Sequence, residues 1–248
     1  MRLFWPAAIA VLVAAPARAD VTARYVIGPG PTGMPPMIIE VNDRGDSRMT
    51  MGNSMAVLTL DGISYIVMAD LGGTFVARQD DVLAIQVESA RAFLNRDLPE
   101  RQHGAHAPPI PAMPAFRAVQ GGSETVGGRT GTIWSLQNST SHAAPPGMDF
   151  VVSTDPDLAP IGRAFARQFT SSRAALRQMT GPPLADADAG FFDGIMAIFE
   201  RGTVIRWGRL MRLESVDAHA ILASDFVLPS PPLTREQLAA RMQGAAPH

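Results

Sequence analysis

Residues 55–67 read MAVLTLDGISYIV, two short apolar runs separated by Asp61-Gly62. An Asp-Gly pair between alternating apolar residues is the strongest short-range signal for a two-residue β-hairpin, because both turn residues must adopt a positive φ. Strands that are joined by so short a turn are antiparallel neighbours. This stretch therefore predicts an antiparallel sheet.

Similar short apolar runs surround this hairpin. The breaks between them carry Gly, Asn and Asp, the residues that favour turns. The sequence thus predicts a β-meander through the first third of the chain, with strands at 21–27, 37–41, 47–51, 55–60, 63–67 and 74–76.

The remainder of the chain mixes helices with further strands. Apolar residues at helical spacing predict helices over 80–94, 155–179 and 187–200, whereas 129–136, 148–153, 203–207, 210–216 and 225–229 are typical of strands. Thr234 followed by Gln237 is a capping box, which predicts a short last helix. We therefore expect an α+β fold in which a curved, half-barrel-like antiparallel sheet is covered on one face by helices.

The composition excludes several classes of chemistry. The 248 residues contain no cysteine, and all 21 basic residues are arginine. Without cysteine, the chain can form no thiol nucleophile, thiolate metal site or disulfide. Without lysine, it can form no Schiff base and no P-loop. Because the formal charge is −2, there is no basic field to attract nucleic acid, and we expect no nucleic-acid partner. We also expect no cofactor.

The first 19 residues have the pattern of a secretory signal peptide. Met1-Arg2 is a positively charged start, residues 3–15 are an apolar run, and Ala17-Arg18-Ala19 is a small-x-small cleavage site. This apolar run is too short for a membrane-spanning helix. We therefore expect a periplasmic or secreted bacterial protein without a transmembrane segment, in which 20–248 form a single α+β domain with a Pro/His-rich loop at 99–114.

Two patterns resemble a family of secreted bacterial domains of unknown function. Residues 122–131, GSETVGGRTG, resemble the G-x-x-x-I/V-x-G pattern with which a strand of that family begins, and residues 202–229 are similar to its closing pattern. The family looks related to the half-barrel fold of the periplasmic lipoprotein carriers and their outer-membrane receptor. The resemblance implies a curved antiparallel sheet covered by helices, and no catalytic residue. The loop at 99–114 and the long helix after Asp155 depart from the family's pattern.

One pair of histidines is a candidate metal site. His103 and His106, with Glu100 upstream, could present two imidazoles and a carboxylate to a divalent ion. Gly104 and the surrounding prolines favour a solvated loop instead, so we expect no metal site tighter than a surface histidine pair.

Three aromatic residues are the candidate ligand-binding residues: Tyr65, Trp134 and Trp207. If the helices cover the sheet imperfectly, these side chains would line an apolar gap, in which a non-catalytic envelope protein could hold an acyl chain or another hydrophobic ligand. A further envelope protein is a second expected partner. Two alternatives remain open: a secreted hydrolase or metal-dependent enzyme that uses His103 and His106, and an interaction module with a filled core and no ligand.

The signal pattern predicts export with cleavage between Ala19 and Asp20. N-terminal sequencing of the exported protein should begin at Asp20. Recovery of the intact Met1 end in a membrane fraction would contradict this prediction.

Overall fold

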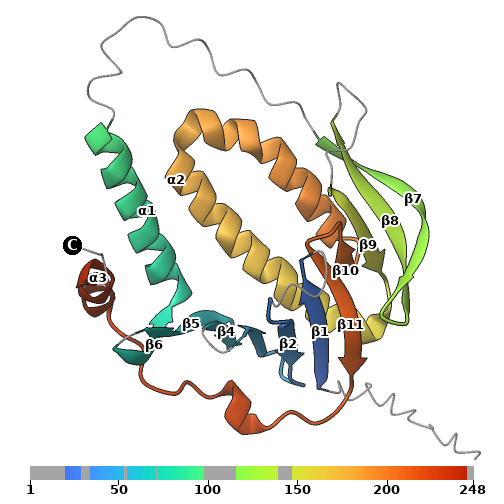
Figure 1. Ribbon diagram of the computed structural model, residues 1–248, viewed down its shortest axis with the longest axis horizontal. Helices are drawn as coiled ribbons and strands as arrows, with labels where there is room; N and C mark the ends of the chain where they lie inside the picture. Colours follow the sequence, from blue (N-terminus) through green and yellow to red (C-terminus); the bar gives the residue numbers. More distant parts are fainter. Residues whose placement is uncertain are drawn as a thin grey trace, which may run out of the picture.

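The structure is a computed structural model that describes residues 20–28, 34–52, 55–70, 72–97, 116–138 and 147–244, except for the side chains of 93–97, 175–177 and 179–189. Eleven described strands form one antiparallel sheet in the order β6-β5-β4-β3-β2-β1-β11-β10-β9-β8-β7. Figure 1 shows that this sheet is curved. The predicted α+β class with a curved antiparallel sheet is thus confirmed, whereas the predicted signal peptide and the loop at 99–114 lie outside the described residues.

The first half of the sheet is the predicted meander. At the hairpin, Leu60 pairs with Ile63, and Asp61 and Gly62 have φ angles of 48° and 82°, the pair of positive values that a tight two-residue turn requires. Each strand pairs with the next along the chain: β1 (Val21–Ile27), β2 (Met37–Val41), β3 (Ser47–Met51), β4 (Met55–Leu60), β5 (Ile63–Asp70) and β6 (Gly73–Arg78).

The second half of the sheet joins the first at β1. It consists of β7 (Phe116–Val126), β8 (Arg129–Asn138), β9 (Asp149–Ser153), β10 (Thr203–Trp207) and β11 (Met211–Asp217). β11 pairs with β1 on one side and with β10 on the other, so the N-terminal strand lies in the middle of the sheet.

Two strand assignments differ from the sequence prediction. The sequence does not predict β7, because its polar residues and the Gly121-Gly122 pair hide the alternation, and its register shifts between Gln120 and Ser123. The strand predicted at 225–229 is wrong: Ala223–Phe226 form a short 3-10 helix instead. Residues 225–229 could not pair with the preceding strand β11, because β1 and β10 already occupy both of its edges.

In the described part of the chain, three α-helices accompany the sheet: α1 (Gln79–Asp97), α2 (Ala159–Phe199) and α3 (Arg235–Gly244). A short 3-10 turn, Pro156–Leu158, precedes α2, and the Asp155 side chain caps it by accepting a hydrogen bond from the Asp157 N–H at 3.0 Å. At α3 the predicted capping box is present, with Thr234 N–H donating to Gln237 Oε1 at 2.9 Å and Gln237 N–H donating to Thr234 Oγ1 at 3.3 Å.

The helix α2 doubles back on itself (Figure 1). A straight helix would hold Phe169 and Phe199 about 45 Å apart, yet their ring centroids are 5.0 Å apart. Gly181-Pro182-Pro183 in the sequence between the two limbs favours this reversal, because proline interrupts helical hydrogen bonding. The limbs, residues 159–174 and 190–199, correspond to the two helices that the sequence predicts.

Each limb of α2 approaches the sheet closely at a glycine. A Cβ atom on Gly162 would lie 2.5 Å from Thr203 Oγ1 and 3.1 Å from Thr203 Cα, and a Cβ atom on Gly194 would overlap with Leu136 Cδ1. Contacts this short leave no room for a side chain. Glycine at these two positions therefore brings the helix backbone close to β10 and β8.

The pairing register assigns each strand residue to one of two faces, because directly opposed residues share a face and successive residues alternate. One row of opposed residues is apolar across six strands, and we call the face on which it lies the Ala23 face. The neighbouring row lies on the opposite face, here called the Thr22 face, and carries several charged residues. The Ala23 row contains Ala77, Ile66, Val57, Met49, Ile39 and Ala23, and the Thr22 row contains Arg78, Tyr65, Leu58, Arg48, Glu40 and Thr22.

Gly162→Ala tests the close approach of α2 to the sheet. We expect the free energy of unfolding to fall by about 1–2 kcal/mol, because the overpacking at Thr203 outweighs the gain in helix propensity. Urea unfolding measures the change. Gly244→Ala is the matched control, since a Cβ atom on Gly244 at the end of α3 would have nothing within 4 Å, and this variant should be neutral or slightly stabilised. Equal stabilisation of both variants would contradict the close contact.

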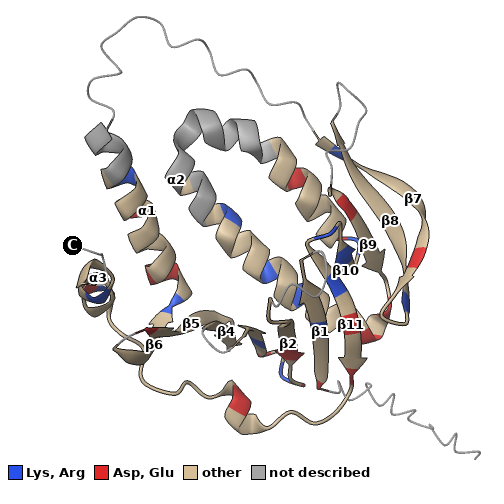
Figure 2. Ribbon diagram, in the orientation of Figure 1, with Lys and Arg blue, Asp and Glu red and all other residues tan. Residues whose placement is uncertain are grey.

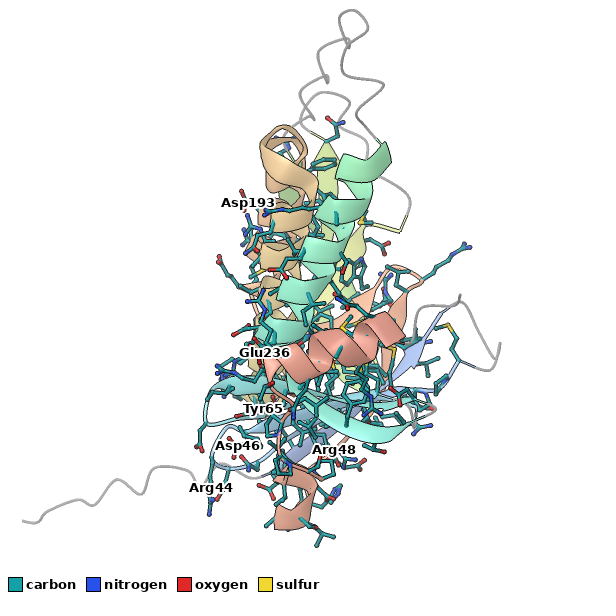
Figure 3. The ribbon with its side chains drawn as sticks, turned by 90° about the vertical axis from the view of Figure 1, so that its left-hand side faces the viewer. Arg44, Asp46, Arg48, Tyr65, Asp193 and Glu236 are labelled. Carbon is teal, nitrogen blue, oxygen red and sulfur yellow. The ribbon has the colours of Figure 1, made fainter. Side chains whose placement is uncertain are left out.

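The helix α3 is held by Arg241 and crosses in front of α1 at the level of the sheet in Figure 3. The Arg241 guanidinium donates to both Asp70 carboxylate oxygens, at 2.8 and 2.5 Å, and lies 4.3 Å above the Phe75 ring. The hydrogen bond from Arg241 lowers the pKa of Asp70 below its ordinary value.

Asp70→Asn tests this anchor through its pH dependence. Because the pKa of Asp70 is lower in the folded state, its contribution to stability is complete above the pKa of an unfolded aspartate and disappears as the pH falls through the folded value. The variant should therefore unfold at slightly less urea than the wild type near neutral pH, and the two midpoints should converge in acid. A difference that persists down to about pH 2 would contradict this.

Candidate functional site

Half of the aromatic residues of the chain meet between α2 and the second half of the sheet. Nine ring pairs with centroids 5.0–6.5 Å apart connect them into one group. Most of these pairs are edge-to-face or tilted, the arrangements that aromatic rings prefer. We call this group the aromatic network: Phe116, Phe150, Phe165, Phe169, Phe191, Phe192, Phe199 and Trp207.

The sheet contributes to this network through a cross-strand row. Phe150 of β9 pairs directly with Trp134 of β8 on one side and with Trp207 of β10 on the other, so the three side chains share a face. The Phe150 and Trp207 rings are 5.0 Å apart. Trp207 in turn pairs with Met211, which pairs with Ile27. Since Ile27 lies on the same side of β1 as Ala23, this row belongs to the Ala23 face.

The network is only partly closed to solvent. Phe150 and Phe199 are buried, at 0% and 6% exposure, but the other six members and Trp134 are half-buried. Furthermore, the Trp207 indole N–H is buried and has no acceptor among the described residues. A buried donor without an acceptor is costly, so a ligand oxygen or a water at this point would stabilise the structure.

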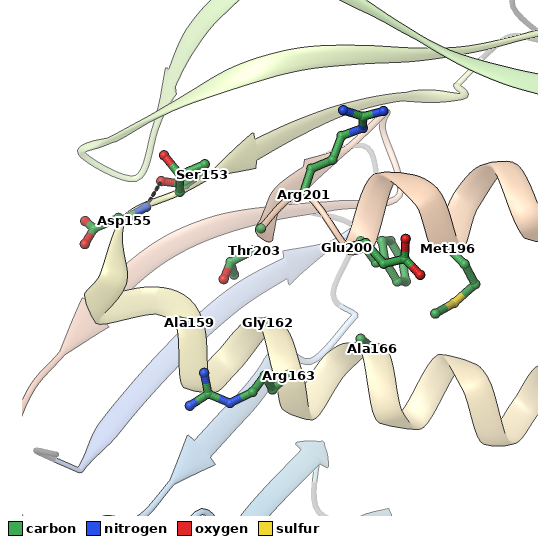
Figure 4. A pocket seen from close by; sticks show the side chains of 13 residues that line it. Ser153, Asp155, Ala159, Gly162, Arg163, Ala166, Met196, Glu200, Arg201 and Thr203 are labelled. Atoms are coloured by element: carbon green, nitrogen blue, oxygen red, sulfur yellow. Dashed lines mark hydrogen bonds between the residues drawn. The ribbon is translucent and has the colours of Figure 1, made fainter.

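A cleft of about 420 Å³ opens where both ends of α2 meet β9 and β10 (Figure 4). Its floor is apolar and its rim carries charge. The Arg201 guanidinium lies 4.0 Å above the Trp134 ring, which places a cation beside the aromatic row. Arg163 makes no ion pair with any described residue, and Figure 2 shows basic residues along the limb of α2 to which it belongs. The lining includes Ala159, Gly162, Arg163, Ala166, Met196, Phe199, Glu200 and Arg201.

Two of the three hydroxyl groups that line this cleft, those of Ser153 and Thr203, are engaged in hydrogen bonds, and the third, Thr154, is exposed. Ser153 Oγ donates to the Thr130 carbonyl at 3.0 Å and accepts from the Asp155 N–H at 3.3 Å, and Thr203 Oγ1 donates to the Leu158 carbonyl at 2.8 Å. The Asp155 carboxylate pairs with Arg129. Within the described part of the chain, none of these three hydroxyl groups is hydrogen-bonded to a histidine or a carboxylate.

The structure brings two of the three predicted ligand-binding residues together. Trp134 and Trp207 flank Phe150, whereas Tyr65 lies on the Thr22 face, between Leu58 and Arg78, and its strand β5 is six positions from β10 in the sheet. Figure 3 shows Tyr65 at the sheet, far from Asp193 in the second limb of α2. The expectation that Tyr65 shares a gap with the two tryptophans is therefore wrong, because the register turns it to the opposite face.

The other candidate residues lie outside the described part. This applies to Glu100, His103 and His106, and among the described residues no three His, Cys, Asp or Glu side chains come together as a metal site.

The sequence analysis missed the role of Phe150 and Phe169. Their signal is present: Phe165 and Phe169 are one helical turn apart, and Phe150 alternates with Val152 in a strand.

The described helices include none that combines the length and the apolar character needed to cross a bilayer. The candidate site combines three features: an aromatic, partly open interior, an adjoining cleft with two arginines, and one indole donor without an acceptor among the described residues. Comparison of the chain with protein-family models, with curated proteins and with solved structures finds no match.

Proposed function

We propose that this protein is a non-catalytic protein of the bacterial envelope that holds an acyl chain or another hydrophobic ligand between α2 and strands β8–β10. The observation that carries the proposal is the aromatic network, whose rings are in mutual contact although six of its eight members remain half-buried. Apolar interiors that lack a ligand function normally bury such side chains. A half-buried aromatic lining supports a surface that a second apolar molecule completes.

The proposal includes a half-barrel-like arrangement in which all three α-helices lie against the Ala23 face. Two contact groups support it. Leu158 and Ile161 at the start of α2 cluster with Ala23 and Ile39, and Val82 of α1 and Leu238 of α3 cluster with Ile66, Val57 and Ala77. This is the covering that the resemblance to the lipoprotein-carrier half-barrels implies.

The unpaired Trp207 indole N–H favours a ligand that carries a hydrogen-bond acceptor. A plain alkane could not satisfy the Trp207 N–H, whereas the carbonyl of an ester- or amide-linked acyl group could accept its hydrogen bond. Arg163 and Arg201 at the adjoining cleft would then face the polar end of the ligand. The predicted export of the chain would place it where such acylated molecules occur.

A saturable binding assay with an apolar fluorescent dye tests the proposal. We expect the wild type to bind the dye and to release co-purified lipid on organic extraction. Trp134→Glu and Trp207→Glu should each weaken dye binding about tenfold or more, because a carboxylate in the apolar lining must be desolvated. Tyr65→Glu is the matched control, since the same change on the Thr22 face should leave binding unchanged.

Circular dichroism identifies any variant that fails to fold, and either tryptophan variant remains informative if the other does not fold. A folded wild type that contains no lipid and binds no dye would contradict the proposal and favour the interaction module without a ligand. Equal loss in the Tyr65→Glu control would show that the aromatic lining is not the binding site.

A further inference from the structure

Four methionines occupy directly opposed positions in four neighbouring strands. Met68 of β5 pairs with Met55 of β4, Met55 with Met51 of β3, and Met51 with Met37 of β2. The register places all four in one line on the Ala23 face. We call Met37, Met51, Met55 and Met68 the methionine row.

The middle of this row is open to solvent. Met51 and Met55 are each 38% exposed and Met68 is half-buried, whereas Met37 is buried at 4% exposure. Methionine that serves only as an adaptable core filler is enclosed by its neighbours. Packing therefore accounts for Met37 and in part for Met68, which contacts the core cluster around Phe75, but it does not account for Met51 and Met55 at the open part of the row.

Thioether sulfur is a soft, neutral metal ligand that selects Cu(I) over the divalent ions preferred by oxygen and imidazole. Directly opposed residues of an antiparallel pair have Cβ atoms about 4.5–5.5 Å apart, and the methionine sulfur lies two bonds beyond Cβ on a flexible side chain. The Cβ atoms of Met51 and Met68, on either side of Met55, are then about 9–11 Å apart, so both outer side chains must extend towards an ion that lies above Met55 for the three sulfurs to bind it. We propose that Met51, Met55 and Met68 bind one Cu(I) ion.

The surroundings of the row favour a site made of thioethers alone. The chain contains no cysteine, so no thiolate competes for the ion. Asp70, two residues after Met68 in β5, is occupied by Arg241, whose guanidinium donates two hydrogen bonds to its carboxylate at 2.5 and 2.8 Å. The flanking partners in the row are Phe75 next to Met68 and Tyr25 next to Met37, which leaves the row without a carboxylate or imidazole. Because thioethers do not bind protons in the physiological range, affinity for Cu(I) should not change between about pH 5 and pH 7.

The first test is an anaerobic titration of the full chain with Cu(I) in competition with bicinchoninate, at about pH 5 and about pH 7. We expect one equivalent to bind with closely similar affinity at both values. Imidazole binds a metal ion only in its neutral form, so binding by His103 and His106 would weaken at the lower pH, whereas binding by thioethers would not. Binding that disappears at the lower pH would overturn the proposal and assign the ion to histidine.

The second test uses variants that keep the volume of the side chain. Met51→Leu/Met55→Leu should lower the affinity for Cu(I) about tenfold or more while leaving the unfolding midpoint nearly unchanged, because leucine replaces methionine at similar volume. Met148→Leu, just before β9 and outside the methionine row, is the matched control and should bind as the wild type does. Ag(I), a diamagnetic substitute, should shift the ε-methyl resonances of Met51, Met55 and Met68 and no others. Unchanged affinity in the double variant, or Ag(I) shifts at other methionines, would overturn the assignment.

Discussion

The antiparallel pairing of β1 with β11 is the interaction on which the rest of the structure depends. It joins residues as distant as Thr22 and Asp217, and it makes one sheet out of a meander, β1–β6, and a second group, β7–β11. Two side-chain contacts reinforce the join: Arg24 pairs with Glu214 at 2.5 Å, and the Tyr25 hydroxyl donates to the Val204 carbonyl at 3.1 Å. Burial raises the pKa of Tyr25 far above its ordinary value, so this hydroxyl remains a donor.

The position of α2 follows from that join. Its first limb begins directly after β9 and its second limb leads into β10, so neighbouring strands fix both of its ends. The ion pair between Arg173 and Asp193 and the contact between Phe169 and Phe199 hold the limbs side by side. Since Gly162 and Gly194 allow the backbone to approach β10 and β8, the aromatic side chains of both limbs reach the cross-strand row at Phe150. The aromatic network therefore depends on contacts that are distant in the sequence.

Local signals predicted the elements well, and the sheet order poorly. The Asp61-Gly62 hairpin, the capping box at Thr234 and the six strands of the meander depend on residues that are neighbours in the sequence, and the structure confirms them. The pairing of β1 with β11 has no local signal, so the middle position of the N-terminal strand was not predictable. Tyr65 shows the same limit at the level of a single residue. Its strand was predicted correctly, but the face that it occupies depends on the register across six strand pairs.

The Ala23 face carries two apolar surfaces with different mechanical properties. The aromatic network consists of rings with few rotatable bonds, which keep a fixed shape, whereas the methionine row consists of flexible, polarizable side chains. Tyr25 and Met37, the buried end of the methionine row, are 1% and 4% exposed and lie between Met51 and the aromatic network in the sheet, so a packed segment separates the exposed methionines from the rings. The proposed ligand site of the rings and the proposed metal site of the thioethers therefore rest on different side chains. The sheet can carry both proposals, because the buried Tyr25 of β1 and Met37 of β2 separate the rings from the exposed methionines.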